Sequence, residues 1–428
     1  GALTDDLVYQ YRRDNDGRFL FIAHAKEPYN KDVSRVQDLR IRIKGNWDVR
    51  LYDSMTGDIR TIAYEIANGH TDVRTLFYDY DSLLLKLMPS EKTDYAFAPA
   101  GEKKPRLYMN RSLMQADFED TAGRLALPDL MEYELSEPNV LLLDQAEWKL
   151  DDGPWQEKEE LLRIDNLARG MLGYPKRNRN IAQPWCIPEE VPEHRLTLRF
   201  AAVSAVDLPD VLLAAEDIGR IRLFWNGREV VREAAGYYVD KAIETLVLPG
   251  GLKKGGNELI AELPLGHRTE TEWFYLLGDF GVAVHGRTAE VIEKPARLSF
   301  GDIVSQGFPF YGGNLTYRIP VAAKGGTLHV RSGKYRGVLQ TVSLDGGPEQ
   351  PLFLPPYMTA FTDVPAGLHE LKLKLFGHRR NAFGQVHLSD ENERWLGPDS
   401  WRSVNDCWTY DYELVRTGVL NAPVVRET

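Results

Sequence analysis

Cysteine is scarce in this sequence: Cys186 and Cys407 are the only two among 428 residues. Two thiols exclude both a disulfide framework and a four-thiolate metal site. The sequence also lacks any run of about 18 apolar residues, which excludes a transmembrane helix. Its first residues, GALTDD, contain no Met, no basic segment and no apolar segment of a signal peptide. We therefore expect a fragment of a longer protein, and the sequence leaves its compartment open.

Positive charge is not in excess either. Lys and Arg total 52 and Asp and Glu total 63, which gives a net charge of −11. A broad phosphate-binding surface is therefore not expected, and nucleic acid is excluded as a partner. The nine His residues show no metal-ligand spacing, so no cofactor or catalytic metal is predicted. A structural Ca²⁺ held by loop oxygens is compatible with the sequence, but no spacing gives it a position.

Short alternating apolar runs, punctuated by Gly, Pro, Asn and Asp, are abundant. They are typical of β-sandwiches and jelly rolls, and the length suggests about three domains. We predict a mostly β fold, with several antiparallel β-sandwich or jelly-roll domains and one long helix. The expected units are an antiparallel β-domain over 1–95, a mixed connector over 96–184, a jelly roll over 185–290 and a second jelly-roll-like domain over 291–428.

Two local patterns are particularly clear. Residues 155–172 carry glutamates early and apolar residues at helical spacing, and Gly173 follows, so a helix is predicted over 155–172. Asn226-Gly227 stands between two apolar runs and predicts a two-residue β-hairpin turn.

Two other short motifs resemble the sequences of nucleotide-binding sites. Asp279-Phe280-Gly281 spells the metal-binding triad of kinases, but no accompanying kinase motif occurs, so we interpret it as a strand end with a tight turn. The glycine-rich run 250–256 is followed by a strand pattern. A phosphate loop would need a helix there, so a turn is predicted.

The stretch 194–263 resembles the galactose-binding-like jelly roll of bacterial glycoside hydrolases. The resemblance is carried by 221–230 around Asn226-Gly227, by 236–240, and by Leu252-x-x-Gly255-x-Asn257-x-Leu259. Residues 47–58, 306–317 and 380–387 look like parts of large α-L-rhamnosidase-like glycoside hydrolases. In those relatives the catalytic carboxylates lie on a preceding (α/β)₈ barrel. Such a barrel needs about 250 residues of alternating strands and helices, and this sequence offers one long helix.

The resemblance thus implies a non-catalytic accessory region that packs beside a barrel domain and binds glycan. The partners expected are carbohydrate and that catalytic domain, and a large apolar face is expected on about 1–150. Sugar recognition combines a flat aromatic ring with polar groups for the hydroxyls. No catalytic residue is assigned, and the candidate carbohydrate-binding residues are Tyr237, Tyr238, Asp240, Trp273, Asp279, Arg379, Asn381 and Trp401.

Alternatives remain at this point. Core or interdomain packing is the stronger explanation for any one group of these aromatic residues, because sandwiches bury Trp and Tyr. The chain could be a free-standing carbohydrate-binding module. It could also be a complete glycosidase that uses loop carboxylates such as Asp240, Asp279, Asp302 or the pair Glu216–Asp217, although no spacing singles out an acid and a base.

Overall fold

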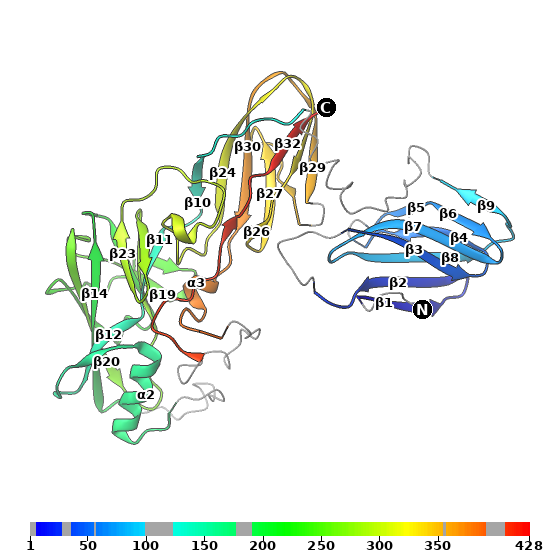
Figure 1. Ribbon diagram of the computed structural model, residues 1–428. Coiled ribbons are helices and arrows are strands. Elements are labelled where there is room, and N and C mark those ends of the chain that lie inside the picture. The colour runs from blue at the N-terminus through cyan, green and yellow to red at the C-terminus, as the bar shows by residue number, and fades with distance from the viewer. Residues whose placement is uncertain are drawn as a thin grey trace.

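The computed structural model describes residues 6–27, 36–54, 57–98, 123–176, 191–353, 357–390 and 407–428 (Figure 1). Within these ranges the fold consists mostly of antiparallel sheets, which confirms the predicted fold class. The sheets pair into three sandwiches, and each sandwich encloses its own cluster of buried apolar side chains. None of the described helices is long and apolar enough to cross a membrane.

The first sandwich, drawn in blue and cyan in Figure 1, packs a five-stranded sheet (β1-β2-β8-β4-β5) against a four-stranded one (β3-β7-β6-β9). Alternation along the strands produces its core: Leu83, Leu85 and Leu87 of β8 point inward. Its strands are β1 Leu7–Arg13, β2 Arg18–His24, β3 Val36–Lys44, β4 Trp47–Tyr52, β5 Ile59–Thr61, β6 Tyr64–Ala67, β7 His70–Tyr78, β8 Ser82–Pro89 and β9 Tyr95–Phe97.

The middle sandwich carries the largest core. Its β14 and β20 pair along their whole length, from His194↔Leu265 to Ser204↔Gly255. Its elements are β11 Asn139–Leu143, β12 Gln145–Leu150, β13 Gln156–Glu160, α2 Leu161–Leu172, β14 His194–Ser204, β15 Val211–Ala215, β16 Arg222–Trp225, β17 Arg228–Glu229, β18 Gly236–Tyr238, β19 Asp240–Val247, β20 Gly255–Leu265, β21 Phe274–Gly278, β22 Gly281–His285 and β23 Thr288–Ile292.

The predicted start of the helix is wrong. Residues 156–160 form strand β13, which pairs with β12, and the helix α2 begins only at Leu161. Glu157 and Glu159 therefore lie on a strand rather than in a first helical turn, and Glu160 is the N-cap. The predicted end is confirmed, since Gly173 takes the left-handed conformation with φ 71° and caps α2.

The last sandwich is interleaved with the middle one along the chain. Residues 123–135 and 139–172, both within the expected connector 96–184, lie in the last and the middle sandwich respectively. The remaining elements are β10 Glu132–Leu135, η2 Val304–Gln306, β24 Leu315–Ala323, β25 Gly326–Arg331, β26 Tyr335–Arg336, β27 Leu339–Leu344, β28 Gln350–Pro351, β29 Met358–Val364, β30 Gly367–Phe376, α3 Arg380–Phe383, β31 Gly418–Val419 and β32 Val424–Glu427.

The three predicted turns are confirmed. Asn226 and Gly227 join β16 to β17 with φ values of 46° and 75°, as a type I′ turn requires. Asp279 and Phe280 connect β21 to β22, which begins at Gly281. The glycine-rich run 250–256 begins in the connection between β19 and β20 and ends in the first residues of β20, with no helix after it.

Candidate functional site

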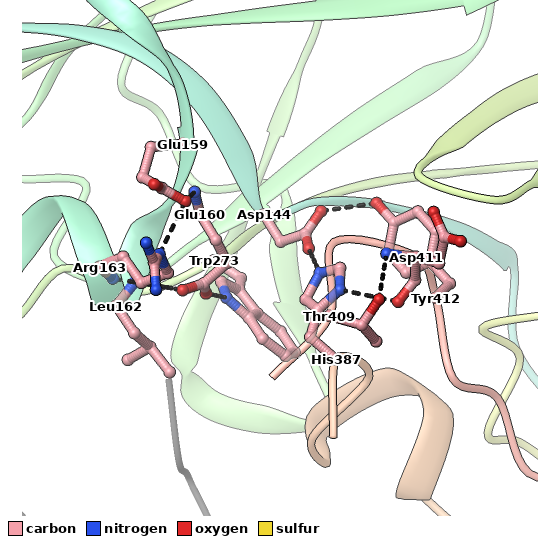
Figure 2. Close-up of polar contacts among 10 residues, drawn as sticks. All are labelled: Asp144, Glu159, Glu160, Leu162, Arg163, Trp273, His387, Thr409, Asp411 and Tyr412. Carbon is pink, nitrogen blue, oxygen red and sulfur yellow. Dashed lines mark hydrogen bonds and ion pairs between the residues drawn. The ribbon is translucent and has the colours of Figure 1, made fainter. Parts of the chain in front are cut away.

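A group of buried polar side chains joins the middle sandwich to the segment after α3 (Figure 2). We call Asp144, Glu160, Trp273, His387 and Tyr412 the buried cluster. Asp144 lies between β11 and β12, and Glu160 ends β13. The Nε2 atom of His387 lies 2.6 Å from Oδ2 of Asp144, and the Tyr412 hydroxyl donates to Oδ1 over 2.7 Å. Both Asp144 oxygens are therefore bonded by protein groups.

The environment of His387 identifies its charge. Its Nδ1 atom faces the carbonyl oxygen of Asp411 at 3.2 Å, while Nε2 faces the Asp144 carboxylate. Both neighbours are acceptors, so both ring nitrogens donate and the ring is an imidazolium. Burial alone would lower the pKa of His387, but the bond and the charge of Asp144 raise it above its usual value. Asp144 and His387 thus form a buried ion pair.

Glu160 is completely buried and stands at the N-terminus of α2. One carboxylate oxygen accepts from the backbone N–H groups of Leu162 and Arg163, at 2.9 and 3.3 Å. The other accepts the indole N–H of Trp273 at 3.1 Å. Burial, and next the negative charge of Asp144, raise the pKa of Glu160 to about 8, in spite of these hydrogen bonds.

These contacts determine what the buried cluster can do. A glycosidase needs two carboxyl groups that face the sugar from opposite sides of the scissile bond. Asp144 is 1% exposed and Glu160 is 0% exposed, and their oxygens are occupied by donors of the protein. The cluster therefore holds residues 386–390 and 407–412 onto the sandwich and orients Trp273. Among the described residues, no group of three or more His, Cys, Asp or Glu side chains could hold a metal ion.

Trp273 also borders a cleft of about 500 Å³ at the end of the middle sandwich. We call this hollow the Trp273 cleft. Its walls come from the segment after β15, the turn after β20 and the start of β21. The side chains that give it its chemistry are Trp273, Phe274, Glu216, Asp217, Arg220, Arg268, Glu270 and Glu272. Trp273 is 6% exposed and Phe274 is 2% exposed, so both rings lie mostly in the core, and Trp273 offers the cleft a small aromatic surface beside the hydrogen-bonding groups. Aromatic surface next to such groups is the usual composition of a site for a sugar.

Negative charge prevails in the Trp273 cleft. Four carboxylates line it and two guanidinium groups accompany them. Burial raises the pKa of Glu216 above its usual value, and the nearby charges of Glu270, Asp217 and Asp240 raise it further. The cleft therefore disfavours an anionic occupant.

Tyr237, Tyr238 and Asp240, the first three predicted site residues, are divided between surface and core. Tyr237 is 59% exposed on β18, whereas Tyr238 is 3% exposed, with its ring 5.5 Å from Tyr275. Asp240 is exposed and its carboxylate accepts the backbone N–H of Ala242 at 2.8 Å. Tyr238 is thus a core residue in this structure, and the three side chains present no common face to solvent.

The second set, Trp273 and Asp279, is separated by strand β21. Trp273 precedes the strand and Asp279 follows it, so about 20 Å of extended chain lies between them. Asp279 is exposed and pairs with Lys294 at 2.5 Å. The structure therefore places Trp273 at the cleft and Asp279 away from it.

The third set lies near α3. Arg379 forms an ion pair with Glu137, with Nη2 2.8 Å from Oε2. Asn381 is 3% exposed and binds the backbone N–H and C=O of Val415. Trp401 lies outside the described residues. Arg379 and Asn381 therefore contribute contacts within the protein.

Sequence reasoning missed Asp144, Glu160 and His387 as interacting residues. Asp144 follows a fully buried strand, and His387 ends one of the stretches that carry the family resemblance. These positions stood out singly, but nothing in the sequence linked them to one another.

No protein-family model matches the sequence, and no curated protein matches it. Among solved structures, the chain is similar to a rhamnosidase from Novosphingobium sp. PP1Y, with 13% identity and a TM-score of 0.18, over 62% of this chain and 21% of that one. The chain spans about a fifth of the length of that rhamnosidase.

Two further structures show similar values. An anti-sigma factor domain-containing protein from Clostridium clariflavum has 8% identity and a TM-score of 0.17, over 56% of this chain and 90% of its own. A cycloalternan-forming enzyme from Listeria monocytogenes, in complex with a pentasaccharide substrate, has 10% identity and a TM-score of 0.14. The match covers 95% of this chain and 30% of the enzyme. The likeness to carbohydrate-active enzymes is loose, and it assigns no role to any residue.

Proposed function

We propose that this chain binds carbohydrate through the Trp273 cleft, as a non-catalytic accessory region of a bacterial glycoside hydrolase. One observation carries the proposal: a cleft of about 500 Å³ combines the small exposed surface of Trp273 with carboxylate and guanidinium groups at one end of the middle sandwich. Aromatic faces contact the C–H groups of a sugar ring. One carboxylate or guanidinium group can form two hydrogen bonds to the hydroxyl groups of the sugar.

The non-catalytic role is supported by the state of the carboxylates. Asp144 and Glu160 are the two carboxyl groups of the buried cluster, and hydrogen bonds within the protein occupy the oxygens of both. Displacing those bonds would leave charges buried without partners, at a cost of several kcal/mol. Asp144 and Glu160 therefore do not serve as a catalytic pair for the cleft.

The accessory role is supported by exposed apolar side chains of the first sandwich. Val8, Tyr9 and Tyr11 of the edge strand β1 are 52%, 64% and 39% exposed, and Phe21 of the neighbouring β2 is 38% exposed. Large exposed apolar side chains on one sheet edge are typical of a surface that another domain covers. The partner we propose there is the catalytic barrel domain of the same hydrolase.

The test is a glycan array probed with the purified chain. Arg220 is exposed in the cleft, so Arg220→Ala removes a hydroxyl-binding group without opening the core. We expect wild-type binding to at least one neutral glycan and a loss of tenfold or more in Arg220→Ala. Trp273→Ala is a poorer probe, because Trp273 is 6% exposed and its removal would also strip Glu160 of a donor.

Tyr237→Ala serves as the matched control. Tyr237 is an exposed aromatic residue that does not line the cleft, so its removal leaves binding unchanged. Absence of wild-type binding to every glycan on the array would reject carbohydrate recognition. Turnover of aryl glycosides by the purified chain would reject the non-catalytic role.

A further inference from the structure

Trp273 borders a second, smaller hollow on the side of the buried cluster. We call it the Gln385 hollow; its polar and aromatic lining comes from Glu160, Trp273, Gln385, His387 and Trp408. Its volume is about 10 Å³, which is room for one group of the size of a water molecule.

Two of its side chains lack hydrogen-bond partners. Gln385 is 6% exposed, and neither the oxygen nor the nitrogen of its side-chain amide is bonded in the described structure. The indole N–H of Trp408 is likewise unbonded. Buried polar groups in folded proteins are bonded almost without exception, and each one left without a partner costs about 1–3 kcal/mol. The unbonded polar atoms of the Gln385 hollow therefore require a hydrogen-bonding partner inside it.

The unsatisfied atoms define the chemistry of that occupant. Gln385 offers one donor group and one acceptor, and Trp408 offers one further donor. A hydroxyl group accepts two hydrogen bonds and donates one, so it matches this set. A carboxylate would face the Gln385 oxygen and the Glu160 carboxyl group without a proton to donate. An ammonium group would face the Trp408 N–H and the His387 imidazolium.

The hollow and the Trp273 cleft share one wall, the Trp273 indole. The indole is fixed in place, because its N–H is bonded to Glu160. To reach the hollow, a ring bound against Trp273 in the cleft must direct one substituent past the indole edge. The negative balance of the cleft disfavours uronates, so the same occupant is neutral.

We propose that the Gln385 hollow receives one hydroxyl group of a neutral sugar bound in the Trp273 cleft. The inference rests on the proposed function and adds to it the class of sugar and the residues that select it. Gln385 and Trp408 are binding residues in this account, and Glu160 is a positioning residue that acts through Trp273.

The test compares two Gln→Leu variants. Gln145 on β12 is also 6% exposed with both amide atoms unbonded, but it does not line the hollow. Gln385→Leu and Gln145→Leu each remove an unpaired buried amide, so neither is expected to lower the Tm of the free chain. Binding is measured by titration calorimetry with L-rhamnose, D-galactose, D-glucose and D-mannose, and with D-galacturonate and D-glucuronate.

We expect the best-bound neutral sugar to lose at least tenfold in affinity for Gln385→Leu and to keep its affinity for Gln145→Leu. The two uronates should bind the wild-type chain more weakly than D-galactose and D-glucose. A monodeoxy analogue of the best sugar, lacking the inserted hydroxyl, should bind wild type and Gln385→Leu equally well. Trp408→Phe provides a second variant with the same expected loss of affinity if Gln385→Leu does not fold.

Three results would overturn the inference, and they are distinguishable. Unchanged affinity in both Gln385→Leu and Trp408→Phe would reject the hollow while leaving carbohydrate binding intact. A lowered Tm in Gln385→Leu with unchanged affinity would show that Gln385 holds a resident water. Failure of the wild-type chain to bind any of these sugars would reject the proposed function and the inference together.

Discussion

The Nε2 atom of His387 lies 2.6 Å from Oδ2 of Asp144, although 243 residues separate them in the chain. Their side chains are 3% and 1% exposed, so the contact is a buried ion pair (Figure 2). It ties the segment after α3 to the strands that open the middle sandwich. The ion pair thus adds a polar contact to the apolar packing of Val386 and Tyr412 against the middle core.

Removing one partner of this pair should be costly. His387→Ala leaves the Asp144 carboxylate buried with only the Tyr412 hydroxyl, and we expect the free energy of unfolding to fall by about 3–5 kcal/mol. Urea denaturation of His387→Ala, Asp144→Ala and the double variant measures the coupling. The double variant should lose much less than the sum of the two single losses. Additive losses would contradict a direct pair.

Stability should fall as pH rises from about 4.5 to 8. The pKa of Glu160 is raised from 4.5 to about 8, so between those values the folded chain holds a proton that the unfolded chain has released. The pKa of His387 is also raised, so its contribution is complete below 6.5 and is lost as pH rises through the raised value. Glu160 and His387 therefore both lower the free energy of unfolding as pH rises.

Glu160→Gln isolates the larger part of this pH dependence. The amide side chain of this variant retains one acceptor oxygen instead of two, so we expect a lower free energy of unfolding at every pH. Because the amide does not titrate, we also expect a flatter pH profile. The difference between wild type and Glu160→Gln should change by up to about 1.4 kcal/mol per pH unit between pH 5 and 7.5. Denaturation at several pH values measures it, with the exposed Glu233→Gln as control. Parallel profiles for wild type and Glu160→Gln would contradict a raised pKa at Glu160.

The Asn226-Gly227 hairpin makes a third, independent prediction. Gly227 has φ 75°, a conformation that costs a β-branched residue about 1–2 kcal/mol. Its Cβ position is open, so strain rather than a clash is expected in Gly227→Val. We expect a loss of about 1–2 kcal/mol in the free energy of unfolding. The nearby Gly219→Val, where φ is not positive and space is also open, should cost less; equal losses would contradict the turn assignment.

Local patterns predicted most of the strands and turns, because alternation and glycine conformation depend on neighbouring residues. Asn226-Gly227 and Gly173 are examples in which the residue type itself determines the backbone. The start of α2 could not be predicted this way. Residues 156–160 have good helix propensity, but pairing with β12 imposes a strand, and Glu160 then caps the helix.

The candidate site was predicted only in part. Trp273 was singled out for its aromatic ring, and the structure places it at the cleft. Tyr238 was likewise singled out for its aromatic ring and Asn381 for its polar side chain, but tertiary packing buries both of them. Asp144, His387 and Gln385 form their environment through contacts between distant segments, which periodicity and spacing do not encode.

One measurement tests the central claim most directly: hydrogen–deuterium exchange of the whole chain with and without its best-binding neutral sugar. Residues 215–221 and 263–274 line the Trp273 cleft, so the account predicts slower exchange in these two segments. Slower exchange is also expected around Gln385, with no change in the first sandwich. Protection confined to other segments, or unchanged exchange at saturating sugar, would contradict carbohydrate binding at this cleft.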